Sequence, residues 1–275
     1  MNAPTIGRLR RFATPIAAVA LVATALGLAG CGSDDDEPAA AATTAAAEGP
    51  SVVASTGWVA AIATLAGAGE VSIIAPSSTQ HPPDYEPKPS DLAAVAGADY
   101  VLLAGFEGFA KQLTEAAGGD AKVITVATTY DPAKLEAEIV KLGTALGTAD
   151  AAATGGAAIR GELEEICADL KTKVAGTPPV TVAHLFVTDW AACAGLTPAG
   201  TYGPAPITPG EVKKLSALDP ALVLENLHMA GSGEAVAGST DATMVELINF
   251  PDDADLDLAA VARTDADLIA GALAP

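Results

Sequence analysis

The 275-residue sequence is poor in basic residues, histidine, cysteine and aromatic residues. Only 14 Lys and Arg oppose 34 Asp and Glu, and the resulting net charge of −20 repels nucleic acid and anionic lipid headgroups and favours cations in a general way. Three cysteines without a CxxC pair disfavour a zinc site built from thiolates. No spacing of serine, histidine and aspartate indicates a catalytic nucleophile, and no glycine-rich stretch has the phosphate-loop pattern. The candidate chemistry is therefore narrowed to three histidines and the carboxylates around them.

The amino terminus has the pattern of a bacterial export signal. Residues 1–30 combine a basic start at Arg8, Arg10 and Arg11 with an apolar run over 16–28, which is too short to be a comfortable membrane span. The sequence LAGC at 28–31 resembles a lipobox and predicts that Cys31 becomes the lipidated, palmitate-bearing first residue. A plain signal peptide in which Cys31 has no role is the alternative. We therefore expect a lipid-anchored protein at the extracytoplasmic face of a bacterial cell membrane.

The composition of the remaining chain predicts a tether followed by two lobes. Residues 31–50 are rich in Asp, Ala, Thr and Gly without apolar periodicity, which predicts a flexible tether. The remaining chain of roughly 225 residues is long enough for two small lobes with separate cores. We expect an N-terminal lobe at 51–147, a linking helix at 148–176 and a C-terminal lobe at 177–275.

Strand-like and helix-like segments alternate through most of this region. Short apolar runs predict strands at 52–54, 71–75, 100–104, 122–126, 180–183, 221–224 and 244–248. Helical periodicity or capping residues predict helices at 58–66, from 89, at 109–117, from 131, at 189–194, 208–218 and 256–273. An apolar stripe with spacings of four, three, four and four predicts the long linking helix, which we expect to end at Gly176. This alternation predicts an α/β fold with two parallel sheets, in which the linking helix joins two βα lobes into a clamshell.

The three histidines each lie shortly after a predicted buried strand. His81, His184 and His228 fall near the carboxyl ends of the two sheets, where open α/β folds bind ligands. Taken singly, His81 is also compatible with an ordinary surface residue and His184 with a buried imidazole bonded to the backbone. His228 suits a helix cap or a supporting role equally well. Their common location makes them candidate members of one site.

Two cysteines lie beyond the predicted export signal. Cys167 falls in the linking helix and Cys193 in the C-terminal lobe. Thiols outside the cytoplasm often pair, and a disulfide would tie the linking helix to that lobe. Two buried free cysteines are the alternative, and the sequence leaves both open.

One stretch of the N-terminal lobe resembles a known family. The sequence HPPDYEPKPSDL from His81, followed by AAVAGADYVLLAG, is similar to the substrate-binding proteins of zinc and manganese ABC importers, the cluster A-I group of metal receptors. The resemblance implies a monomeric metal-binding clamshell, not an enzyme, that delivers its cargo to an ABC permease. It also implies that His81 is the first metal ligand, and that His184, in TVAHLF, is a later one.

The sequence departs from the family pattern at two ligand positions. The family's second histidine precedes an Asp-Pro pair by four residues, a position that Ala127 occupies here. Asn249, in LINFP, stands where a carboxylate usually follows the last strand, with Asp252 and Asp253 just beyond. The histidine-rich acidic loop of many zinc members is absent from the sequence. Two of the four ligands that the resemblance implies are therefore missing or altered.

His228 could replace one of the missing ligands. The predicted ligand set is therefore His81, His184, His228 and, as the weaker fourth candidate, Glu225. A structural role for Glu225, or a hydrogen bond from it to a ligating imidazole, is the alternative. Zinc suits imidazoles and one carboxylate in a tetrahedral site, whereas manganese favours oxygen ligands and fits less well. Because imidazoles bind metals in their neutral form, we expect capture to weaken as the pH falls through about 6.5.

Two other functions compete with divalent-metal capture. The missing ligands favour a binding protein of the same fold for a metal chelate or another small organic molecule. An extracytoplasmic zinc hydrolase with three protein ligands and an open water position is a further hypothesis. The sequence identifies no general base for that reaction.

Overall fold

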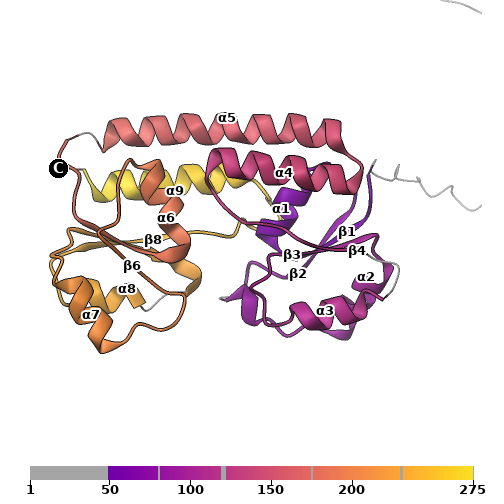
Figure 1. The fold of residues 1–275 in the computed structure, drawn as a ribbon, viewed down its shortest axis with the longest axis horizontal. Coiled ribbons are helices and arrows are strands. Elements are labelled where there is room, and N and C mark those ends of the chain that lie inside the picture. Colours follow the sequence, from indigo (N-terminus) through magenta and orange to yellow (C-terminus); the bar gives the residue numbers. More distant parts are fainter. Residues whose placement is uncertain (1–48, 80, 119–121, 175, 230–231, 275) are drawn as a thin grey trace, which may run out of the picture. The chain divides into compact units, whose positions relative to one another are not determined.

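The computed structural model describes residues 49–79, 81–118, 122–174, 176–229 and 232–274 (Figure 1). The predicted export signal, Cys31 and all but the last two tether residues lie outside the described residues. Within the described ranges, no helix is long and apolar enough to cross a membrane. The described residues all belong to one compact unit.

The N-terminal lobe is a parallel four-stranded sheet with strand order β2-β1-β3-β4. Its strands are β1 (Val52–Thr56), β2 (Val71–Ala75), β3 (Tyr100–Leu103) and β4 (Lys122–Thr125). Its helices are α1 (Gly57–Leu65), the 3₁₀ turn Pro82–Asp84, α2 (Pro89–Gly97), α3 (Ala110–Ala116) and α4 (Pro132–Leu146). The central strands β1 and β3 are buried throughout, as expected for a parallel sheet covered on both faces.

The C-terminal lobe repeats this arrangement with strand order β6-β5-β7-β8, again all parallel. Its strands are β5 (Thr181–His184), β6 (Gly200–Tyr202), β7 (Leu222–Asn226) and β8 (Thr243–Leu247). Its helices are α6 (Thr188–Cys193), α7 (Pro209–Ser216), α8 (Ser232–Ala237), α9 (Leu258–Ala272) and the 3₁₀ turns Leu185–Val187 and Leu227–Met229. Neither β6 nor α8 was predicted from the sequence; β6 has only three residues, too few to show a periodic pattern.

Helices run along one side of both lobes and connect them (Figure 1). The long helix α5 (Ala149–Lys173) packs against α4 of the first lobe and α9 of the second. Asp131 caps α4 by accepting the N–H of Lys134, and Gly147 ends it with a left-handed backbone. Helix α5 ends at Lys173, three residues before the predicted end at Gly176.

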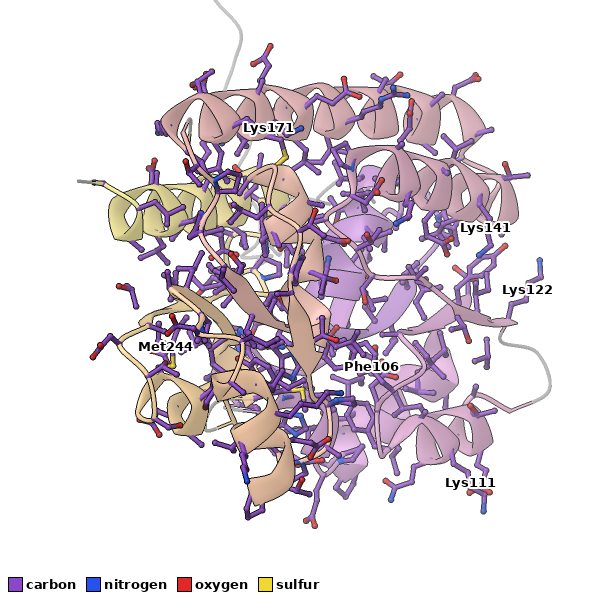
Figure 2. All side chains as sticks on the ribbon, turned by 60° about the vertical axis from the view of Figure 1, so that its left-hand side comes forward. Phe106, Lys111, Lys122, Lys141, Lys171 and Met244 are labelled. Carbon is purple, nitrogen blue, oxygen red and sulfur yellow. A yellow bond between two sulfur atoms is a disulfide. The ribbon has the colours of Figure 1, made fainter. Side chains whose placement is uncertain are left out.

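A disulfide joins α5 to the second lobe (Figure 2). Cys167 on α5 and Cys193 at the end of α6 are bonded, with 4.7 Å between their Cα atoms. Of the two alternatives left open by the sequence, the structure therefore shows the bridge.

The predicted fold class is confirmed by these two parallel sheets with alternating helices. The domain limits at 51–147, 148–176 and 177–275 stay predictions. In each sheet the strand order reverses between the two central strands. These are β1 and β3 in the first lobe and β5 and β7 in the second. Ligand sites of open α/β folds lie at the carboxyl edge near such a point.

Candidate functional site

A cavity of about 540 Å³ lies at the carboxyl ends of both sheets. Its lining residues lie at or after the carboxyl ends of strands β2 to β8, and Trp58 of α1 contributes one more side chain. The lining residues are Trp58, His81, Pro83, Ala104, Phe106, Thr128, Leu185, Phe186, Thr188, Asp189, Pro204, Asn226, His228, Met229, Asn249 and Phe250. Both lobes therefore contribute to one ligand-sized space.

His81 enters this cavity from the N-terminal lobe, in the tautomer that suits a metal ligand. It precedes the 3₁₀ turn Pro82–Asp84, and its Nδ1 lies 2.7 Å from Oδ2 of Asp84. Because a carboxylate only accepts hydrogen bonds, the neutral imidazole must carry its proton on Nδ1. The Nε2 lone pair is then available to an ion, and metal-ligating histidines commonly have such a carboxylate partner.

His228 enters the cavity from the C-terminal lobe. It lies in the 3₁₀ turn after β7, and its ring packs edge-on against Phe250 with 4.7 Å between the ring centroids. Its backbone N–H donates to Oδ1 of Asn226 at 3.0 Å, which fixes the turn. The structure thus brings His81 and His228 to one cavity from opposite lobes.

His184 lies at the end of β5 but does not line the cavity. Its Nδ1 accepts the N–H of Phe186 at 3.2 Å, so the proton of the neutral ring is on Nε2. The Nε2 edge faces Gly203, whose backbone has φ = +84° and where any Cβ would overlap the imidazole. Burial lowers the pKa of His184 to about 4. In this arrangement His184 caps a turn with one nitrogen and packs against backbone with the other.

Glu225 also lies away from the cavity lining. It is fully buried in β7, where its carboxylate accepts the N–H of Asn226 at 2.8 Å and the N–H of Gly233 in α8. Burial raises the pKa of Glu225, and the two backbone N–H groups oppose that rise. The observed contacts tie α8 to the sheet.

The four predicted ligands are therefore not gathered around one point. In the part of the chain that the structure describes, no three His, Cys, Asp or Glu side chains are grouped closely enough to hold a metal ion. Ligation by His184 requires its ring to leave the Phe186 N–H, and ligation by Glu225 requires the loss of two backbone hydrogen bonds. Ligation by all four residues stays a prediction.

The two altered positions have different surroundings. Ala127 is exposed after β4, its N–H donates to Oε1 of Glu138 at 3.1 Å, and the next residue, Thr128, lines the cavity instead. Asn249 lines the cavity after β8 and is 3% exposed. Its Oδ1 is buried and has no hydrogen-bond partner among the described residues. Of the two positions that depart from the family pattern, only Asn249 has a side chain with a hydrogen-bond acceptor, Oδ1.

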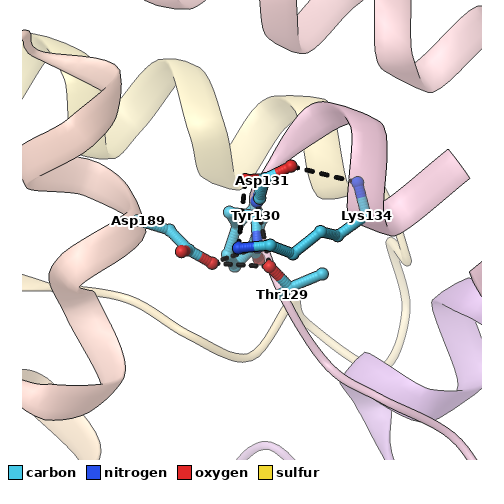
Figure 3. A network of polar contacts seen from close by, with 5 residues as sticks. All are labelled: Thr129, Tyr130, Asp131, Lys134 and Asp189. Atoms are coloured by element: carbon cyan, nitrogen blue, oxygen red, sulfur yellow. Dashed lines mark hydrogen bonds and ion pairs between the residues drawn. The ribbon is translucent and has the colours of Figure 1, made fainter. Parts of the chain in front are cut away.

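Two aspartates form hydrogen bonds between the lobes. Figure 3 shows Asp189 of α6 accepting hydrogen bonds from Oγ1 of Thr129 at 2.6 Å and from the N–H of Tyr130 at 3.0 Å. The second aspartate, Asp253, accepts the N–H of Ser77 with both oxygens, at 2.9 and 3.0 Å. Hydrogen bonds to charged acceptors are stronger than neutral ones, so these two contacts stabilise the observed lobe arrangement.

Several aromatic side chains line the cavity. Trp58 packs on Tyr130 at 5.0 Å and on Phe250 at 6.0 Å, measured between ring centroids. Phe106 of the first lobe and Phe186 of the second stack at 6.3 Å although each is about 40% exposed. Figure 2 shows Phe106 at the junction of the lobes. The cavity therefore has a large apolar surface as well as its two imidazoles.

Sequence reasoning missed several of these residues. Asp84 could have been found from its position three residues after His81, where a short turn brings a carboxylate to the ring. Asp189 and Asp253 could not, since their partners are 60 and 176 positions away in the sequence. Trp58 is both buried and part of the cavity lining.

Comparisons with known proteins agree with this architecture. Residues 52–143 match the family model "Zinc-uptake complex component A periplasmic". The laminin-binding protein Lbp of Streptococcus pyogenes aligns at 20% identity and a TM-score of 0.61, covering 82% of this chain and 99% of Lbp. AdcAII of Streptococcus pneumoniae aligns at 18% identity and a TM-score of 0.63, covering 82% of this chain and 99% of AdcAII.

A third solved structure contains a bound ion. FpvC of Pseudomonas aeruginosa in complex with Mn²⁺ aligns at 17% identity and a TM-score of 0.64, covering 81% of this chain and 97% of FpvC. The family model confirms the resemblance found in the sequence over the N-terminal lobe, and the solved structures confirm the fold over both lobes.

Proposed function

We propose that this protein is an extracytoplasmic solute-binding protein that captures a divalent metal ion, zinc in the first place, and delivers it to an ABC permease. The proposal rests on one observation above all: His81 and His228 approach a single cavity from opposite lobes. The zinc-uptake family match over 52–143 and the Mn²⁺ bound to FpvC support a divalent cargo. The net charge of −20 favours a cation over an anion.

In this proposal His81 and His228 supply the imidazoles, and Asp84 keeps His81 in the tautomer with a free Nε2. Zinc accepts such nitrogen ligands at about 2.0 to 2.1 Å, and open positions can be filled by water or by further groups. His184 and Glu225 remain the predicted additional ligands. Their recruitment requires local rearrangement around Phe186 and Gly233 when the ion binds.

Zinc loading of the purified chain tests the proposal. After loading and desalting, we expect about one zinc per parent molecule by elemental analysis, and clearly less in His81→Ala and in His228→Ala. Gln112→Ala, at an exposed position on α3, is the matched control and should retain zinc like the parent. A parent chain that retains no zinc, or two histidine variants that both retain it fully, would contradict the assignment. His184→Ala measures whether that ring joins the site.

The membrane anchor is a separate part of the proposal. Cys31 is proposed to carry the lipid, with palmitate among its acyl chains, and the protein to act as a monomer beside its permease. Growth of expressing bacteria with an alkyne-labelled fatty acid should label the parent chain and leave Cys31→Ser unlabelled. Labelling that survives the substitution would exclude Cys31 as the anchor.

A small organic ligand is the second candidate, and the size of the cavity favours it. A volume of about 540 Å³ with aromatic walls lies within the usual range of sites for small organic molecules. A metal-free organic ligand should raise the melting temperature of the parent and of His81→Ala alike. A zinc-dependent ligand should stabilise only chains that keep the metal site.

A further inference from the structure

A divalent ion in this cavity needs a negative charge close by. His81 and His228 are neutral when they bind a metal, so the ion keeps its full charge while it loses part of its water. Taking a charge out of water is costly unless an opposite charge is near. Asn226 and Asn249, which also line the cavity, are uncharged amides. An anionic side chain in the cavity wall offsets this cost.

Among the described residues that line the cavity, Asp189 on α6 is the one carboxylate. Two other carboxylates near the predicted ligands are placed differently. Glu225 lies outside the lining, and its carboxylate accepts two backbone N–H groups. Asp84 binds Nδ1 of His81 from outside the lining, and its side chain is 80% exposed, so water screens its charge. Asp189 is therefore the anion best placed to act on an ion in the cavity.

The two oxygens of Asp189 have different surroundings. Oδ2 accepts hydrogen bonds from Oγ1 of Thr129 at 2.6 Å and from the N–H of Tyr130 at 3.0 Å (Figure 3). Oδ1 accepts no hydrogen bond from the described residues and, unlike Oδ1 of Asn249, it is accessible to solvent. Carboxylates that take part in metal sites are commonly held by hydrogen bonds in this way. Asp189 thus has a fixed orientation and an acceptor that a ligand can use.

The charge of Asp189 is also not taken up by an ion pair in the part of the chain that the structure describes. The cation that acts on it is Lys134, whose pKa is raised mainly by Asp131 and further by the charge of Asp189. The ammonium group of Lys134 is bonded to Asp131 at 3.2 Å, and it is 70% exposed. The charge of Asp189 therefore remains available to a cationic cargo.

The placement of the possible ligands favours an ion that keeps some of its water. No three His, Cys, Asp or Glu side chains of the described ranges are close enough to bind one ion directly. The cavity of about 540 Å³ has room for waters beside the ion. A water on the ion extends the reach of the site, because a water-mediated hydrogen bond is nearly as favourable as a direct one.

We propose that Asp189 is the anionic residue of the cation site, where its Oδ1 accepts a hydrogen bond from a water bound to the captured ion. This rests on the proposed capture of a divalent metal in the same cavity and names a further residue that determines its strength. The imidazoles of His81 and His228 bind the ion directly, and Asp189 supplies the opposite charge through a charge-assisted hydrogen bond.

Two substitutions of Asp189 separate its charge from its shape. Asp189→Asn keeps an oxygen that can accept from Thr129 and Tyr130 but loses the charge. In a competition titration of the purified chain with a zinc chelator, its zinc affinity should fall by about tenfold or more. Asp189→Glu keeps the charge on a longer side chain and should bind zinc more tightly than Asp189→Asn. A role confined to the contact between the lobes predicts the opposite order, because the amide preserves that contact better.

Asp253→Asn is the matched control, because Asp253 also links the lobes but lies outside the cavity lining. It makes the same change in charge, and its zinc affinity should stay within about twofold of the parent. Equal losses in Asp189→Asn and Asp253→Asn would overturn the inference, as would tighter binding by Asp189→Asn than by Asp189→Glu. Parent-like affinity of Asp189→Asn, with zinc binding lost in His81→Ala, would overturn it and leave the proposed function standing. A parent chain that binds no zinc would contradict both.

Discussion

Asp265 on α9 should make the stability of this protein fall between acid and neutral pH. The residue is fully buried, its Oδ1 accepts the N–H of Ile248 at 3.0 Å, and its Oδ2 has no partner among the described residues. Burial raises its pKa to about 7 from 3.8, against the smaller opposing effect of the Ile248 hydrogen bond. The folded protein therefore binds this proton more tightly than the unfolded chain does.

The sign and the size of the effect follow from linkage. A carboxyl group with a raised pKa in the folded state stabilises the fold fully below pH 3.8, and this contribution is lost as the pH rises to about 7. Between pH 4.5 and pH 8 the loss amounts to about 3 kcal/mol of unfolding free energy. His184 acts in the opposite direction, because its lowered pKa of about 4 removes stability as the pH falls below 6.5. The parent curve alone therefore combines two effects.

The substitution Asp265→Asn isolates the carboxyl group. The amide keeps an oxygen for the Ile248 N–H but does not ionise, and His184 is unchanged in both proteins. Measured by urea unfolding, the stability of the variant relative to the parent should rise by about 3 kcal/mol from pH 4.5 to pH 8. The control Asp267→Asn, exposed on the same helix, should give a curve parallel to the parent. Parallel curves for Asp265→Asn as well would refute the reasoning.

Three further predictions concern the site and its support. Asp84→Asn should weaken zinc binding by about tenfold in a competition titration. The variant lacks the carboxylate that holds the proton of His81 on Nδ1. Gly203→Ala should cost at least about 2 kcal/mol in urea unfolding, since φ is +84° and the new methyl group would overlap His184. Replacing Cys167 and Cys193 by serine should cost about 3 to 4 kcal/mol, as expected for a bridge with a sequence separation of 26.

Each of the three predictions has a control or an outcome that would contradict it. Gly210→Ala is the control for the glycine substitution, because a Cβ there would meet only Thr208 Oγ1 at 3.9 Å. An equal effect at both glycines would rule out the overlap with His184. A reducing agent should destabilise the parent and leave the double serine variant unchanged. Zinc affinity of Asp84→Asn equal to that of the parent would show that the carboxylate does not prepare His81 for the metal.

The fold could be predicted from the sequence because the patterns that indicate its strands and helices are local. Runs such as 52–54 and 100–104 are apolar on both faces of a strand, and Asp131 with Pro132 marks the start of a helix. The same rules missed β6 and α8, which are held by neighbours: β6 pairs with β5, and Glu225 of β7 binds the N–H of Gly233 in α8. Short elements of this kind depend on tertiary contacts that no local pattern contains.

The site could be predicted only in part from the sequence, because the spacing of residues gives the position of a histidine but not its hydrogen-bond partner. His81 follows β2 and His184 is the last residue of β5, and both match the family pattern, yet their rings make different contacts. Asp84 binds Nδ1 of His81 and leaves Nε2 free, whereas the Phe186 N–H occupies Nδ1 of His184 and puts the proton on Nε2. The partner atom decides which nitrogen can take a metal. For His81 the partner is the side chain of Asp84, three residues away, and for His184 it is the backbone N–H of Phe186 in a turn.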